Sequence, residues 1–290
     1  MDRPEPVHGV DLRLLPARDA HLPLTDLALR RGFGAFDFFR VEAGVPLFLD
    51  DHLARFDRSA DLLGLAPRPS PERVRAHVLD LIRANGGGTF GIQTFLTGGD
   101  PLDGFTPGTP RLLALVVPPP TYPEHAYRDG VAVITHAYLR DLPQAKTTNY
   151  FTAVRLAGAM RDAGALEVVY HDRGRLLEAS RCNLVVVDEA GRYRTADADV
   201  LRGVTRLNLE RALADTETPL VSGEVTLEEA YAAREAFLTS TTKGVMPVVR
   251  IDDRPVGDGR PGPATAFAAE RLDAHRAAWL AAHRADPETA

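Results

Sequence analysis

Apolar and polar residues follow two different periods in the first third of the chain. Residues 36–41 are mainly aromatic and β-branched, a turn follows at 43–44, and residues 46–49 resume the apolar run. This pattern predicts a β-hairpin. Beyond it the apolar residues lie three or four positions apart, which is typical of an amphipathic helix.

Two helices are predicted here. The first begins at Asp50 or Asp51, whose carboxylate can cap it, and ends at Gly64. The second begins at Pro71 and ends at the glycine run 86–88. The apolar positions that define the first helix are Leu53, Phe56, Ala60 and Leu63.

Strands and helices alternate through the rest of the chain, which predicts a mixed α+β fold. A turn at 201–204 is expected to lead into a further helix. The predicted strands are 89–97, 111–117, 131–136, 167–171, 176–187, 236–239 and 245–251, and the predicted helices are about 149–162 and a closing helix through Phe267, Leu272, Trp279 and Leu280.

A proline-rich segment divides the sequence. Four of the seven residues in 117–123 are proline, and such a run stays extended and stiff. We therefore predict a small N-terminal domain at 1–117, an interdomain linker at 118–124 and a larger C-terminal domain at 125–290.

The composition excludes several classes of protein. The 290 residues are 44% hydrophobic and 26% charged, as in folded globular proteins. Lys and Arg total 34 against 40 Asp and Glu, a net charge of −6, which disfavours nucleic acid as a partner. Any anion site must therefore be local.

Cysteine and histidine content argues against a metal site. The single cysteine, Cys182, rules out an intramolecular disulfide and a multi-thiolate zinc site. The nine histidines include no pair at i, i+4 spacing. No signal peptide or membrane-length apolar run is evident, so we expect a cytoplasmic protein with no membrane partner.

Three segments could bind an anion. Residues 201–206 place a glycine turn before a helix, whose first N–H groups lack partners. Residues 240–242 end a strand with three hydroxyls, and Arg55 lies in the first turn of a helix, where the dipole disfavours a cation. Lys146 in a polar stretch and Glu178 on an apolar strand are further candidates. Each feature alone is more typical of a turn or a solvated side chain.

Taken together, these segments resemble a known family. The motifs HLAR, KTTNY, LLEASRCNLVVV, LRGVTR and EAFLTSTTKGVMPV occur in the order and approximate spacing of the fold-type IV pyridoxal phosphate enzymes, which include D-amino acid and branched-chain aminotransferases and aminodeoxychorismate lyase. The resemblance spans about residues 26–251. It implies a two-domain fold, with a small N-terminal α/β sandwich and a larger C-terminal pseudo-barrel that carries the catalytic lysine.

The resemblance also implies roles for individual residues. Lys146 is expected to form the Schiff base with pyridoxal 5'-phosphate and to move the substrate's Cα proton. Glu178 is expected to face the pyridine nitrogen, and Tyr150 to lie beside the ring hydroxyl. The expected phosphate contacts are Arg55, the Val204 and Thr205 N–H groups and the Thr241 hydroxyl.

Members of this family are homodimers with the active site at the subunit interface and follow ping-pong kinetics between an amino acid and a 2-oxo acid. The resemblance therefore predicts the same oligomeric state and the same kinetics for this chain. Residues near 30–36 are expected to reach the partner's site.

The sequence departs from two subfamily patterns. Branched-chain enzymes usually carry Tyr-x-Arg where this chain has Gly91 and Gln93. The best-studied D-amino acid enzymes hold the substrate carboxylate with an arginine and a histidine on a loop corresponding to residues 96–105, which has neither here. The Thr-Ser-Thr-Thr segment nevertheless resembles the D-amino acid enzymes most.

A substrate carboxylate still needs a cation, because a buried carboxylate without a partner is costly. The candidates are Arg30, Arg31, Arg181 and Lys243. We therefore predict a D-amino acid aminotransferase of the D-alanine or D-glutamate type. The alternatives are a branched-chain L-amino acid aminotransferase, aminodeoxychorismate lyase and, outside the family, a cofactor-free binding scaffold.

Overall fold

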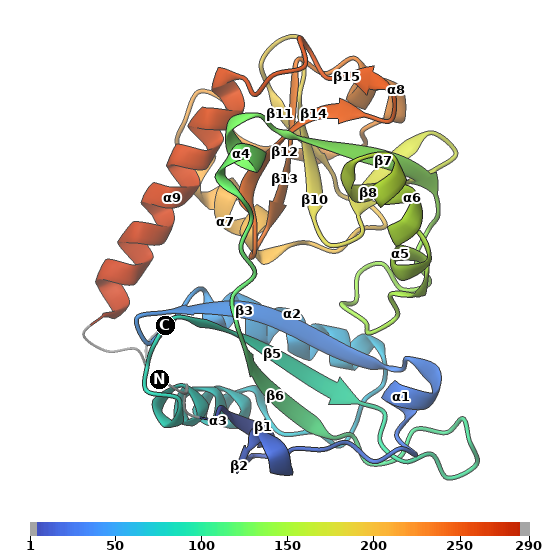
Figure 1. The fold of residues 1–290 in the computed structure, drawn as a ribbon, viewed down its shortest axis with the longest axis vertical. Helices are drawn as coiled ribbons and strands as arrows, with labels where there is room; N and C mark the ends of the chain where they lie inside the picture. Colours follow the sequence, from blue (N-terminus) through green and yellow to red (C-terminus); the bar gives the residue numbers. More distant parts are fainter. Residues whose placement is uncertain (1–4, 285–290) are drawn as a thin grey trace. The chain divides into compact units, whose positions relative to one another are not determined.

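The computed structural model describes residues 5–284, and these form two compact units (Figure 1). Of the described residues, unit 1 contains 5–120, Ala145–Asn149 and 278–284, and unit 2 contains Thr121–Gln144 and Tyr150–Ala277. The domain boundary at 118–124 stays a prediction. Lys146, which we expected in the C-terminal domain, lies in a segment whose contacts assign it to unit 1.

Unit 1 is built on a six-stranded antiparallel sheet with the strand order β2-β1-β6-β5-β3-β4. Alternate residues of β3 are buried, including Phe39 and Val41, and they share one core with apolar side chains of α2 and α3. Two helices therefore cover one face of the sheet. The elements are β1 (Val7–Val10), β2 (Arg13–Pro16), the 3-10 helix η1 (Ala17–Asp19), α1 (Leu27–Arg31), β3 (Gly34–Glu42), β4 (Val45–Pro46), α2 (Leu49–Leu62), α3 (Pro71–Ala84), β5 (Phe90–Thr97) and β6 (Leu112–Val117).

The start of α2 differs from the prediction. The residue before the helix is Phe48, whose φ of 52° is left-handed, and its side chain makes no capping hydrogen bond. Asp50 and Asp51 lie inside the first turn, where the helix dipole favours carboxylates. The predicted cap at Asp50 or Asp51 is therefore wrong, whereas α3 begins at Pro71 as predicted, with Ser70 as its cap.

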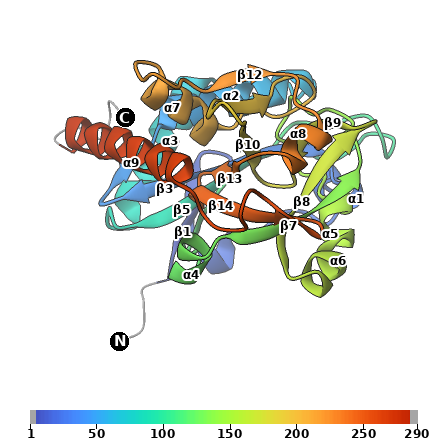
Figure 2. The same cartoon turned by 90° about the horizontal axis from the view of Figure 1, so that it is seen from above.

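Unit 2 contains a nine-stranded sheet with the order β12-β11-β10-β13-β14-β7-β8-β9, and β15 pairs with β14. Residues 180–182 alone connect β9, at one edge, to β10, several strands away in this order. The sheet must therefore curl, as the view from above shows (Figure 2). The elements are α4 (Glu124–Arg128), β7 (Val131–Ala137), α5 (Phe151–Arg155), α6 (Ala157–Asp162), β8 (Ala165–Asp172), β9 (Arg175–Ala179), β10 (Asn183–Val187), β11 (Tyr193–Ala196), α7 (Val204–Leu213), β12 (Val221–Gly223), α8 (Leu227–Tyr231), β13 (Glu235–Ser240), β14 (Gly244–Ile251), β15 (Arg254–Pro255) and α9 (Pro263–His283).

Two predicted elements of unit 2 are each two elements in the structure. The helix predicted at about 149–162 is α5 and α6, separated at Leu156. The strand predicted at 176–187 is β9 and β10, because the chain turns at residues 180–182. The first interruption is the apolar Leu156, which fits the helical period, whereas the second contains Ser180 and Arg181, a polar break between two apolar runs that the prediction joined.

Candidate functional site

Lys146 is fixed in unit 1 by backbone hydrogen bonds on both sides. Its carbonyl accepts from the Phe36 N–H at 2.9 Å, and its own N–H donates to Ser59 Oγ at 3.0 Å. The side chain is half-buried, with its Nζ 4.4 Å from the centroid of the Phe36 ring. The backbone of Lys146 is therefore anchored to both β3 and α2.

Arg55 lies one turn before Ser59 on α2. The Ser59 hydroxyl accepts from the Lys146 N–H and donates to the Arg55 carbonyl at 2.8 Å. A single buried hydroxyl thus connects the lysine segment to the helix turn that carries the predicted phosphate arginine.

The guanidinium of Arg55 forms a buried ion pair with the carboxylate of Asp37. Its Nε and Nη2 donate to the two oxygens of Asp37 at 2.8 and 2.7 Å, and His52 Nδ1 lies 2.8 Å from Asp37 Oδ1. Burial raises the pKa of Asp37, but Arg55 and His52 outweigh it and hold that pKa well below its usual range. Burial lowers the pKa of His52, so the neutral ring donates to the carboxylate.

Asp37 is a site residue that the sequence analysis missed. The pairing with Arg55 uses Nε and Nη2, which leaves the Nη1 side of the guanidinium outside this pair. The signal was an acidic residue at a position that alternation assigns to the buried face of β3. Such a carboxylate requires a charged partner nearby.

Glu178 is buried on β9 of unit 2, and both its oxygens are bound. Oε1 accepts from Arg140 Nε at 2.8 Å, and Oε2 accepts from the Leu201 N–H at 3.1 Å. Arg140 also donates to the Pro143 carbonyl. Arg140 was not predicted, although it precedes Lys146 by only six residues in the same polar stretch.

The start of α7 is shaped by Asn183, the first residue of β10. Its Nδ2 donates to the Leu201 carbonyl at 2.8 Å, and its Oδ1 accepts from the Gly203 N–H at 3.0 Å. A Cβ on Gly203 would lie 2.4 Å from Asn183 Oδ1, so this close approach requires glycine. No side chain caps the helix start at Gly203, which leaves the N–H groups of Val204 and Thr205 to a ligand or water.

Thr241 lies close to Asn183, at the same end of the paired strands β10 and β13. Asn183 pairs with Thr239 across β10 and β13, and Thr241 follows two residues later, in the turn after β13. The Thr239 hydroxyl is buried and has no hydrogen-bond partner among the described residues. An uncapped helix start and an unpartnered hydroxyl fit a phosphate group, which accepts several hydrogen bonds.

Arg181 and Lys243 share one partner, Glu167 on β8. Lys243 Nζ lies 2.9 Å and Arg181 Nη2 2.8 Å from the same oxygen, Oε1. Glu167 was not predicted, although it is a carboxylate within an apolar strand. Burial raises the pKa of the neighbouring Cys182 thiol to about 12, which agrees with a packing role for that residue.

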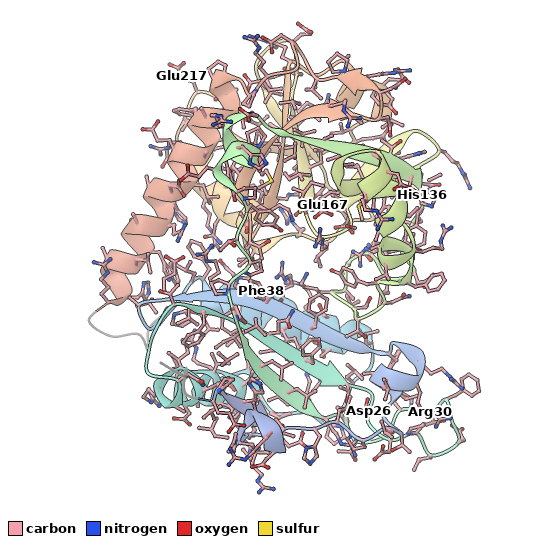
Figure 3. The ribbon with its side chains drawn as sticks, viewed as in Figure 1. Asp26, Arg30, Phe38, His136, Glu167 and Glu217 are labelled. Atoms are coloured by element: carbon pink, nitrogen blue, oxygen red, sulfur yellow. The ribbon has the colours of Figure 1, made fainter. Side chains whose placement is uncertain are left out.

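The other predicted residues lie on exposed or half-buried elements. Arg30 and Arg31 are exposed at the end of α1 in unit 1, and Arg30 is labelled in Figure 3. The next residue, Gly32, accepts at its carbonyl from Thr148 Oγ1 at 2.7 Å, so α1 is tied to the lysine segment. Tyr150 is half-buried and immediately precedes α5 in unit 2.

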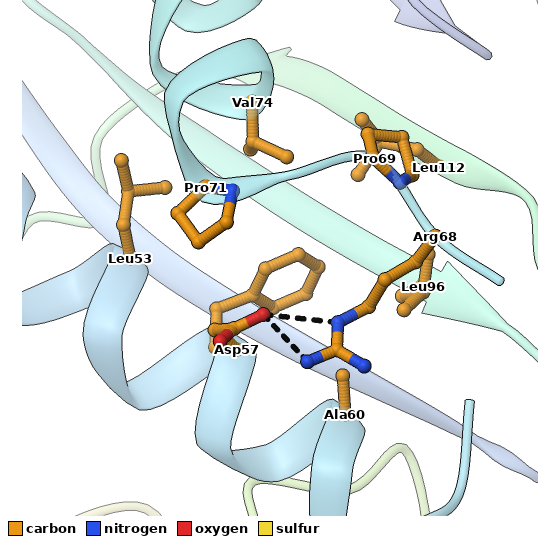
Figure 4. Close-up of a pocket in the computed structure, with 10 residues that line it drawn as sticks. Leu53, Asp57, Ala60, Arg68, Pro69, Pro71, Val74, Leu96 and Leu112 are labelled. Carbon is orange, nitrogen blue, oxygen red and sulfur yellow. Dashed lines mark hydrogen bonds and ion pairs between the residues drawn. The ribbon is translucent and has the colours of Figure 1, made fainter. Parts of the chain in front are cut away.

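A small pocket in unit 1 is lined by none of the predicted catalytic, cofactor-binding or substrate-binding residues (Figure 4). It lies between α2, α3 and the sheet, and the ion pair of Arg68 with Asp57 lies at its side. Most of its walls are apolar core residues, and we assign no chemistry to it. Among residues 5–284, neither a cluster of side chains suited to a metal ion nor a helix long and apolar enough to cross a membrane is found.

The groups described above are the ones a pyridoxal phosphate enzyme needs: an anchored lysine, a buried carboxylate and an anion site at a helix start. Comparison with known sequences identifies the family. Residues 34–251 match the class IV aminotransferase family, and the chain belongs to it. The family, fold class and cofactor predicted from the sequence are therefore confirmed: the protein is an aminotransferase that uses pyridoxal phosphate, with amino acid and keto acid substrates.

Similar proteins come from two subfamilies. The D-alanine aminotransferase of Bacillus licheniformis is 27% identical over 87% of this chain and 91% of its own length. Two solved branched-chain aminotransferases are each 25% identical to this chain. The one from T.th., with pyridoxamine 5'-phosphate, covers 97% of this chain and 98% of its own at a TM-score of 0.85. The one from Thermoproteus uzoniensis, with norvaline, covers 96% and 98% at 0.84.

Proposed function

We propose that the protein is a D-amino acid aminotransferase that moves the amino group between a D-amino acid and a 2-oxo acid by a ping-pong mechanism. The observation that carries the proposal is the pair of cations, Arg181 and Lys243, that share Glu167. Each cation lies within three residues of a predicted cofactor contact, Glu178 or Thr241. This position suits the carboxylate of an amino acid substrate.

A second observation disfavours the branched-chain pattern. A Cβ on Gly91 would lie 2.6 Å from the Phe38 ring, so β5 has no room for the tyrosine of the Tyr-x-Arg motif unless Phe38 moves. Branched-chain and aminodeoxychorismate lyase activities remain the alternatives that the substrate test addresses.

Lys146 is assigned the covalent and proton-transfer roles. The chain contains two lysines, Lys146 and Lys243, and Lys243 is committed to Glu167. When bound, pyridoxal phosphate supplies an aldehyde for the amino group and a ring that accepts the electrons left by the Cα proton. The Lys146 amine would hold the cofactor through that aldehyde, and as a free amine it would take up and return the proton of the substrate's Cα.

The remaining residues would hold the cofactor and the substrate. Glu178, fixed by Arg140 and the Leu201 N–H, would hold a proton at the pyridine nitrogen. Tyr150 would contact the ring hydroxyl. We assign the phosphate to Arg55, to the Val204 and Thr205 N–H groups and to the Thr241 hydroxyl. We assign the substrate carboxylate to Arg181 and Lys243. We also propose that the protein is a cytoplasmic homodimer in which Arg30 and Arg31 reach the substrate site of the partner subunit.

A panel of amino donors tests the function. Purified protein loaded with pyridoxal phosphate is mixed separately with D-alanine, D-glutamate, L-leucine, aminodeoxychorismate and (R)-1-phenylethylamine, and loss of the visible absorption band is followed. We expect fast loss with the D-amino acids. Fast loss with L-leucine but not with D-alanine would overturn the D-amino acid assignment, and pyruvate released from aminodeoxychorismate would favour the lyase.

The lysine assignment has a separate test. Borohydride reduction of the loaded protein followed by peptide mapping should place the cofactor on Lys146. Lys243 is the other lysine of the chain, so the peptide map has to distinguish label on Lys146 from label on Lys243. Label on Lys243, or a colourless protein with no labelled lysine, would overturn the assignment.

A further inference from the structure

The carboxylate of Glu167 in unit 2 accepts hydrogen bonds from several side chains. The residue is fully buried on β8 and is labelled in Figure 3. Its Oε1 accepts from Lys243 and Arg181, and its Oε2 accepts from Ser180 Oγ at 2.6 Å. Cys182 Sγ also lies 3.7 Å from Oε1, so four donors from two turns, 180–182 and 241–243, meet on one side chain.

The cluster has one positive charge in excess. Two cations face one carboxylate, and the other titratable groups that act on the cations are Cys182 and Tyr122. The Cys182 thiol stays protonated at neutral pH because burial raises its pKa to about 12. The Tyr122 ring lies 4.9 Å from Lys243 Nζ. The excess charge is therefore available to an anion that joins the cluster.

The two cations differ in what they can reach. The side chain of Lys243 is 1% exposed, whereas that of Arg181 is 51% exposed. Arg181 contacts Glu167 through Nη2, and a guanidinium has five N–H donors in a planar fork. Arg181 can therefore keep this contact and still present donors to a second carboxylate, which Lys243 cannot do from its buried position.

We propose that Glu167 is a positioning residue of the substrate-carboxylate site: it holds Lys243 buried and Arg181 half-exposed, so that their single excess charge receives one carboxylate of the substrate. This inference rests on the proposed function. It changes the role of Lys243 from a direct contact to a fixed charge behind Arg181. Because Glu167 ties both turns together, it also fixes Arg181 relative to Glu178 and Thr241.

The test compares Glu167→Gln with Arg181→Met and with Glu217→Gln, an exposed control in the same unit (Figure 3). Steady-state kinetics with D-alanine are measured from pH 7 to 10, and the visible band and thermal unfolding report cofactor loading and folding. We expect KM to rise at least tenfold in Glu167→Gln and in Arg181→Met, with kcat changed less than threefold, and both constants to be unchanged in Glu217→Gln.

The pH profile separates positioning from a structural role. Burial lowers the pKa of Lys243, while its neighbours, Glu167 among them, raise it above the ordinary value, so Lys243 should not change wild-type KM up to pH 10. Without the charge and the hydrogen bond of Glu167 the burial effect is less opposed, and Lys243 should lose its proton at a lower pH. KM in Glu167→Gln should therefore rise further toward pH 10, while Glu167→Asp, which keeps the charge, should stay flat.

Each result decides between the two proposals. An unchanged KM in Arg181→Met overturns the proposed carboxylate site, and the positioning role with it. A raised KM in Arg181→Met with wild-type KM and a flat pH profile in Glu167→Gln overturns the positioning role alone. If Glu167→Gln does not fold, Ser180→Ala, which removes a donor to Oε2, carries the test: a KM equal to wild type overturns the positioning role.

Discussion

The most direct test of unit 1 is Asp37→Asn. The substitution keeps the size of the side chain and removes its charge, so the guanidinium of Arg55, with 6% of its side chain exposed, loses its buried counter-ion. Asp37 also accepts from His52, and an asparagine oxygen replaces only one of the two carboxylate oxygens. Three contacts between 2.7 and 2.8 Å are therefore weakened at once.

The expected loss is large for a single atom replacement. Removing one partner of a buried ion pair costs about 3–5 kcal/mol. Because the amide can keep one hydrogen bond, we expect the lower end, about 3 kcal/mol. A chain of 290 residues gains about 0.6 kcal/mol/K of entropy on unfolding, so each kcal/mol lowers Tm by about 2 °C and the melting temperature should fall by about 5 °C.

The assay is thermal unfolding of wild type, Asp37→Asn and Asp80→Asn, each with and without pyridoxal phosphate. Asp80 pairs with Arg83 at the surface, where the expected loss is about 0.5 kcal/mol or less. If Arg55 holds the phosphate, the cofactor supplies a second anion and the defect of Asp37→Asn should shrink in the loaded protein. A Tm loss no larger than that of Asp80→Asn refutes the ion-pair argument, and equal defects with and without cofactor refute the phosphate assignment.

The same cluster sets a pH dependence. The pKa of Asp37 is held below its unfolded value of about 4, so its contribution to stability is complete above pH 4 and is lost as the pH falls further. The pKa of His52 is lowered by burial, so its neutral form is favoured and stability begins to fall below about pH 6.5. Urea unfolding between pH 3 and 8 should show both steps in wild type and lose the lower one in Asp37→Asn.

Three further outcomes are expected. Gly203→Ala should weaken pyridoxal phosphate binding at least tenfold by equilibrium titration, since its Cβ would displace Asn183 from the start of α7; unchanged affinity would remove this helix from the phosphate site. Arg140→Met should lower kcat with D-alanine at least tenfold while the protein still binds cofactor, because Glu178 loses the guanidinium that holds it; wild-type kcat would count against that role. Cys182 should resist alkylation at pH 8 until the protein unfolds, as mass spectrometry can show, because its buried thiol has a pKa of about 12.

Local patterns predicted the elements of unit 1 from β3 onward, but not β1, β2, η1 and α1 before it, and they did not predict its ion pairs. The β3 and α3 segments have clear periods of two and of three to four, so their positions followed from the apolar residues. Arg55 was expected in the first turn of a helix, but α2 begins at Leu49, so that prediction is wrong and Arg55 lies in the second turn. Its partner Asp37 lies 18 positions earlier. Alternation assigns Asp37 to the buried face of β3, but which residue of α2 it meets depends on how the sheet and helix pack.

The partners of Glu167 also lie far from it in the sequence, so local patterns could not predict them. Lys243 lies 76 positions after Glu167, and the two meet because β8 and the turn after β13 belong to one curled sheet. The sequence revealed two cations near cofactor motifs, and charge alone assigned both of them to the substrate. The structure adds the carboxylate between them, and that carboxylate makes them unequal: one cation is committed within the protein, and the other can be shared with a ligand. A cation near a motif is therefore a candidate for substrate binding only after its partners within the fold have been counted.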